Sequence, residues 1–108
     1  MVIKKDMDVL SYVSKKEQTE TVGFEEACKA AALELAELVI KKHQDYGEEN
    51  ILTFGELGVL VRCSDKVARL RNILQNNLTV QYEGKMDSWK DLGGYSIIAL
   101  MLNNNTFK

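Results

Sequence analysis

Apolar residues recur at intervals of three and four along most of this chain, the spacing that lines one face of a helix. The strongest such segment extends from about Phe24 to Asp45, and alanine, leucine, glutamate and lysine, the best helix formers, dominate it. Acidic residues come first in this segment and Lys41 and Lys42 come last, an order that complements the helix dipole. The pattern predicts a long helix that ends before Gly47, a residue typical of helix stops.

Further helices follow from the same periodicity. One extends from about Thr53 to Gln75, and Thr53 with Glu56 matches the capping box that begins many helices. Another begins at Asp87 or Ser88 and continues to about Leu102. A weaker amphipathic segment from Lys4 to about Lys16 predicts a short N-terminal helix.

These elements predict an all-α fold, an antiparallel bundle of three long helices plus a short N-terminal helix. The absence of proline and the lack of alternating β-branched runs favour helices over a sheet. We expect one domain over residues 1–108, in which 1–23 form an N-terminal segment and linker and 24–103 form the bundle core. Three helices leave flanks uncovered, so we expect a homo-oligomer, a dimer or tetramer, that forms through the first segment or the last helix. Gly93 and Gly94 indicate either a close contact or a simple kink in that last helix.

Composition bears on whether the protein binds nucleic acid or a membrane. The chain has 45% hydrophobic and 28% charged residues and a formal net charge of -2, so no global positive field indicates direct binding of nucleic acid. Its longest apolar run, Ile97–Leu102, is far shorter than the roughly 20 residues that span a membrane, and no signal-like stretch begins the chain. We therefore expect a cytoplasmic protein without membrane contact. Cys28 and Cys63 fit reduced thiols, and the single histidine excludes a zinc-finger pattern.

Carboxylates at helical spacing point to a bound cation. Asp87 and Asp91 share one face of the last helix, where two like charges repel each other unless a cation lies between them. Magnesium prefers one or two protein carboxylates together with phosphate oxygens and water, and Glu83 could add a further oxygen. Antiparallel packing brings Asp65 of the preceding helix within one to two turns. The alternative is that Asp87 caps the helix and Asp91 is a surface acid.

Basic residues on the middle helix would face these acids. Arg62, Lys66 and Arg69 follow steps of three and four, and a hairpin sets Arg69 level with Asp91. Cations beside a metal-binding acid suit a triphosphate, because they neutralise oxygens that the metal does not reach. The alternative is a network of interhelical salt bridges, from Arg69 to Asp87 or Asp91, that holds no ligand.

Two other groups of polar residues lie on the first long helix. At its end, His43, Asp45 and Tyr46 could contact the base or sugar of a nucleotide or order the turn. The alternative is a simple helix stop with an aromatic plug. Glu34 and Glu37 form an ExxE pair near the middle of the helix, which fits surface acids better than metal ligands.

Taken together, these strings resemble the phage and bacterial nucleotide-modification-associated domain, a small helical family related to MazG-like all-alpha nucleoside triphosphate pyrophosphohydrolases. The resemblance covers roughly Leu35 to Leu102. The matching elements are Lys42 with Asp45-Tyr46-Gly47, Arg62 with Asp65-Lys66 and Arg69-Leu70, and Glu83 with Asp87, Asp91-Leu92 and Tyr95. The resemblance implies an all-α fold, oligomerisation and a magnesium-dependent attack of water on a nucleoside triphosphate that releases pyrophosphate.

The chain departs from the metal motifs of the MazG-like enzymes, which are an ExxE on one helix and an ExxD on the next. Val59 stands where the second acid after Glu56 would be, and Ser88 stands where the first acid before Asp91 would be. Half of the ligands that the resemblance implies are therefore missing unless Asp65, Asp87 or the Glu34/Glu37 pair replaces them.

From the residues and the resemblance we expect a magnesium-dependent nucleotide-binding domain, a (deoxy)nucleoside triphosphate pyrophosphohydrolase of phage nucleotide metabolism. The expected metal ligands are Asp65, Asp87 and Asp91, the phosphate-binding residues are Arg62, Lys66 and Arg69, and the nucleotide contacts are His43, Asp45, Tyr46 and Tyr95. The alternatives are a non-catalytic nucleotide-binding module, which sequesters a nucleotide or assists DNA modification, and a helical interaction protein.

Overall fold

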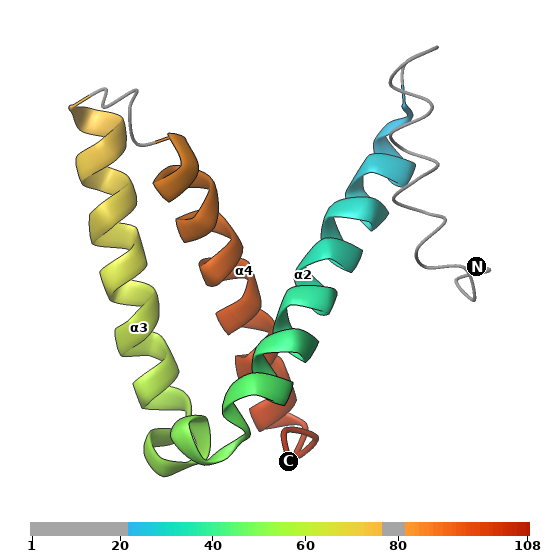
Figure 1. Cartoon of the computed structure of the whole chain (residues 1–108), viewed down its shortest axis with the longest axis vertical. Coiled ribbons are helices and arrows are strands. Elements are labelled where there is room, and N and C mark those ends of the chain that lie inside the picture. Colours follow the sequence, from blue (N-terminus) through green and yellow to red (C-terminus); the bar gives the residue numbers. More distant parts are fainter. Residues whose placement is uncertain (1–21, 77–81) are drawn as a thin grey trace. The chain divides into compact units, whose positions relative to one another are not determined.

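The computed structural model describes residues 22–76 and 82–108, and all regular structure within these ranges is helical (Figure 1). Helix α2 covers Phe24–Tyr46, α3 covers Glu49–Gln75 and α4 covers Tyr82–Asn103. The described residues contain no strand, which confirms the all-α expectation. The N-terminal helix expected near residues 4–16 lies outside the described residues. None of the helices in the described ranges combines the length and apolarity that a membrane crossing requires.

Helix α3 differs from the sequence-based expectation at its start. It begins at Glu49, and Thr53 is an internal residue whose Oγ1 donates a hydrogen bond to the Glu49 carbonyl oxygen at 2.7 Å. The expectation that Thr53 caps this helix is therefore wrong. The reason is Gly55, whose φ of 63° and ψ of -155° kink the helix and join a short first part to a long second part. Residues other than glycine rarely adopt this backbone conformation.

The chain forms two compact units, residues 1–37 and 38–108. The second unit holds the end of α2, all of α3 and α4, and the C-terminal residues. Within it α3 and α4 lie side by side and antiparallel (Figure 1). The core of this unit centres on Ile51, Val59 and Phe107, each at least nine-tenths buried. Partly buried hydrophobic residues pack against this centre: Cys63, Tyr95, Ile98, Ala99, Met101 and Leu102.

Helix α4 is continuous through Gly93 and Gly94, which answers the choice between a contact and a kink. Gly94 is buried, and a Cβ atom placed on it would lie 3.4 Å from Val39 Cγ2 of α2. The glycine therefore lets the end of α2 approach the α4 backbone closely. The close contact is made within the chain.

The C-terminal residues return to the core through a tight helix stop. Asn105 adopts φ 59°, the Asn105 N–H donates to Leu102 O at 3.2 Å, and the Thr106 N–H donates to Met101 O at 2.8 Å. This is a Schellman motif, in which asparagine is the commonest substitute for glycine at the left-handed position. The reversal places Phe107 in the core, where its ring and that of His43 form a T-shaped pair with centroids 5.6 Å apart.

Candidate functional site

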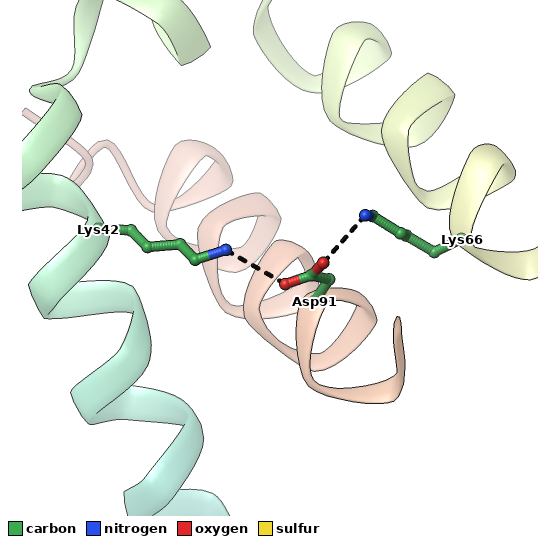
Figure 2. A network of polar contacts seen from close by, with 3 residues as sticks. All are labelled: Lys42, Lys66 and Asp91. Carbon is green, nitrogen blue, oxygen red and sulfur yellow. Dashed lines mark hydrogen bonds and ion pairs between the residues drawn. The ribbon is translucent and has the colours of Figure 1, made fainter. Parts of the chain in front are cut away.

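Asp91 of α4 joins three helices through two lysines (Figure 2). Lys42 of α2 donates from Nζ to Asp91 Oδ1 at 3.2 Å, and Lys66 of α3 places its Nζ 3.0 Å from Oδ2. The Asp91 side chain is 18% exposed, whereas the Lys42 side chain is 51% exposed. Each carboxylate oxygen therefore has its own cationic partner, and one of those partners reaches toward solvent.

The charge of Asp91 depends on these partners. Burial raises the pKa of the Asp91 carboxyl, but hydrogen bonds from Lys66 and Lys42, with their positive charges, lower the pKa by more. The net result is a pKa below the ordinary aspartate value, so Asp91 is ionised at neutral pH. The three side chains together carry one excess positive charge, which favours an anion nearby.

A cavity of about 220 Å³ opens beside this bridge, and Lys42 belongs to both. Among the described residues, every charged side chain in its lining is basic: Lys42, Arg62 and, when protonated, His43. The lining also includes the aromatic rings of Tyr46, Tyr95 and Phe107. The lining consists of Val39, Lys42, His43, Tyr46, Gly47, Asn50, Ile51, Arg62, Tyr95, Ile98 and Phe107. We call this cavity the basic pocket.

Two of the basic side chains in this pocket already have local partners that fix their positions. Arg62 Nη2 donates to Asn50 Oδ1 at 3.2 Å, which joins the two parts of α3 on either side of the Gly55 kink. His43 Nε2 lies 3.1 Å from the Lys108 backbone oxygen and 3.4 Å from Glu48 Oε1. The His43 nitrogen is engaged by two oxygens, whereas Arg62 keeps further N–H donors besides the one that Asn50 accepts, so Lys42 and Arg62 are the better ligands for an incoming anion.

The structure does not bring the three residues that we expected to hold magnesium together as one metal site. Asp65 and Asp87 are exposed, and Asp91 is engaged by the two lysines. Within residues 22–76 and 82–108, no three histidine, cysteine, aspartate or glutamate residues gather as a metal site would require. The described acids therefore do not fit a magnesium ion as they stand, and magnesium binding stays a prediction.

The expected phosphate-binding residues also separate. Arg62 lines the basic pocket, Lys66 contacts Asp91, and Arg69 is exposed outside both. The expected register of α3 against α4 is wrong by one turn, because Lys66 and not Arg69 meets Asp91. Helix α4 begins at Tyr82, before the expected start at Asp87, so the join between the helices is shorter than we assumed.

Three of the four expected nucleotide contacts, His43, Tyr46 and Tyr95, lie together in the pocket lining. Asp45 is exposed and pairs with Lys41 at 3.9 Å on the surface of α2. Sequence reasoning missed Asn50 and Phe107 as pocket residues. The signal for Phe107 was the asparagine run before it, since asparagine tolerates the left-handed turn that brings the chain back.

Comparison of the chain with protein-family models, with curated proteins and with solved structures finds no match. The resemblance to the nucleotide-modification-associated domain therefore stays a prediction. The basic pocket and the two ion pairs of Asp91 are the features of the described residues that indicate a function.

Proposed function

We propose that this protein binds a nucleotide in the basic pocket. The observation that carries the proposal is the uniform charge of the lining: all charged side chains of the described lining residues are basic, although the whole chain has a net charge of -2. Two tyrosines and a phenylalanine share the same lining. Cations suit phosphate oxygens and aromatic rings suit a base, so the two kinds of group match the two ends of a nucleotide.

Arg62 and Lys42 have different tasks in this proposal. Arg62 is held by Asn50 and lines the pocket, and its guanidinium can form paired hydrogen bonds with phosphate. Lys42 is half exposed and shares its ammonium group with Asp91, so it can rotate toward a phosphate. When Lys42 turns toward a phosphate, Lys66 still forms an ion pair with the Asp91 carboxylate.

The size of the pocket limits how much of the ligand is enclosed. Pockets that bury most of a drug-sized ligand have volumes of about 300–1,000 Å³, and this one measures about 220 Å³. We therefore expect the pocket to enclose part of the nucleotide, with the remaining phosphates near the half-exposed Lys42 and solvent.

Binding without hydrolysis agrees best with the position of Asp91. Its two oxygens are each engaged by a lysine, and Asp65 and Asp87 are exposed, so no described set of acids is ready to hold a metal ion. Magnesium-dependent release of pyrophosphate remains the second candidate, which rests on the resemblance. A pyrophosphate-release assay with each triphosphate that binds distinguishes the two.

The test is a thermal-shift screen of the purified protein with nucleoside mono- and triphosphates, each in magnesium and in EDTA. A ligand of the native state raises stability by RT ln(1 + [L]/Kd), about 2.7 kcal/mol at a hundredfold excess over Kd. We expect at least one nucleotide to raise the melting temperature while inorganic sulfate at the same ionic strength does not. A melting temperature unchanged by every nucleotide would contradict the proposal.

A further inference from the structure

Helix α3 carries a long exposed apolar stripe beside its buried residues. Val59, Leu70 and Ile73 are buried on one side of this helix. On the adjoining side, Leu57, Leu60, Val61, Val67 and Leu74 have exposed fractions between 41% and 71%. Isolated exposed hydrophobic residues are ordinary, but a row of them along one helix indicates an interaction surface.

The spacing of the stripe is that of a helix–helix seam. Leu57, Leu60, Ser64, Val67, Arg71 and Leu74 alternate steps of three and four residues, the a and d positions of a heptad repeat. The second part of α3, after the Gly55 kink, carries the whole stripe. At 1.5 Å per residue the stripe is about 26 Å long. It therefore has the period and length to pack against a second helix.

Two charged residues on this stripe indicate what that second helix is. Glu56 lies at its N-terminal end and Arg71 lies near its C-terminal end. Neither forms an ion pair with any described residue of its own chain. An arginine in an apolar seam is costly to bury unless an acid from the other helix pairs with it. The stripe thus supplies both the base and the acid, at opposite ends.

We propose that α3 packs antiparallel against α3 of a second copy of this chain and makes a homodimer. In an antiparallel seam, a positions face d positions, which sets Leu57 level with Leu74 of the second copy and Arg71 level with Leu60. Glu56 of the second copy then lies about one turn from Arg71, within reach of its long side chain. Twofold symmetry makes the same pair twice. A parallel pairing would instead set Arg71 beside Arg71.

The size of the stripe indicates a weak dimer. A seam about 26 Å long on a helix about 10 Å wide covers roughly 260 Å² per copy, less than in stable complexes, so we expect an association that depends on protein concentration. This location differs from the N-terminal segment and α4, which the sequence favoured. It is also independent of the basic pocket, because no stripe residue lines that pocket.

The test is a charge exchange followed by sedimentation velocity over a wide concentration series. Glu56→Arg places two arginines together, and Arg71→Glu places two glutamates together. We expect each single variant to weaken the dimer at least tenfold and the double variant Glu56→Arg/Arg71→Glu to restore it. Arg69→Glu, on the same helix but off the stripe, is the matched control and should dimerise like the wild type. Circular dichroism establishes that each variant is folded.

Restoration by the double exchange separates this interface from simple loss of structure. A wild-type protein that stays monomeric throughout the series would overturn the proposal. So would single variants that dimerise like the wild type, because the contact would then lie elsewhere on the chain. A double variant as weak as the single ones would also overturn the antiparallel arrangement.

Discussion

Lys42 pairs with Asp91 at 3.2 Å and also lines the basic pocket, so one ammonium group connects the interhelical bridge with the candidate ligand site. The connection gives the bridge two roles. It holds α2, α3 and α4 together, and it supplies the half-exposed ammonium group of Lys42 to the pocket. Variants of the bridge should therefore change stability in ways that differ from variants of the pocket.

Asp91→Asn should lower the free energy of unfolding by about 1–2 kcal/mol. The change removes two hydrogen bonds between charged groups, but exposure of Lys42 weakens one of them. Urea denaturation measures the difference. Asp65→Asn is the matched control, because Asp65 is exposed on α3 and forms no ion pair with a described residue; it should stay within about 0.5 kcal/mol of the wild type. Equal losses in both variants would refute the bridge.

The contribution of Asp91 should disappear in acid. Its pKa is lower in the folded chain than in the unfolded chain, so the stabilisation is complete above the unfolded pKa of about 4 and is lost as the pH falls through the folded value. The difference in unfolding free energy between wild type and Asp91→Asn should therefore shrink below about pH 4. A difference that grows in acid would mean that the folded pKa is raised.

Gly55→Ala should destabilise the protein by about 1–3 kcal/mol, because φ 63° with ψ -155° is open to glycine almost alone. The kink orients Asn50 toward Arg62, so the same variant should also disturb the basic pocket. Gly23→Ala is the control at the N-terminal end of α2, where an added Cβ atom comes no closer than 3.9 Å to a neighbour. Thermal unfolding of both variants compares them, and a Gly55→Ala protein as stable as Gly23→Ala would exclude the kink.

Ser88→Ala should leave stability unchanged or raise it by about 1 kcal/mol. Ser88 is completely buried on α4, and its hydroxyl has no hydrogen-bond partner among the described residues. Ser88→Leu should cost about 1–3 kcal/mol, because a buried site of this size lacks room for the added atoms. Denaturation midpoints measure both. A marked loss with alanine would indicate that the hydroxyl has a partner after all.

Periodicity and composition were enough to predict the α2 helix and the glycine stop at Gly47, because both depend on neighbouring residues only. They were not enough for α3, where the left-handed Gly55 kink interrupts the pattern. The choice of Lys66 over Arg69 as the partner of Asp91 depends on how far the helices slide along each other. Side-chain spacing within one helix carries no information about that offset.

The sequence brings together only some of the residues that line the basic pocket. His43 and Tyr46 come from one helix end, so their proximity follows from sequence spacing. Arg62, Tyr95 and Phe107 join them only through tertiary packing. The pairing of Asp91 with two lysines likewise depends on the packing of three helices, which the spacing of acids along one helix does not predict.

The most direct test of nucleotide binding compares two arginines of α3 by titration calorimetry, with the nucleotide that gives the largest thermal shift. Arg62 lines the basic pocket and Arg69 is exposed outside it. We predict that Arg62→Gln weakens binding at least tenfold, as expected for loss of a hydrogen bond to a charged phosphate, while Arg69→Gln binds within about twofold of the wild type. Equal affinity in all three proteins, or a larger loss in Arg69→Gln, would contradict the account.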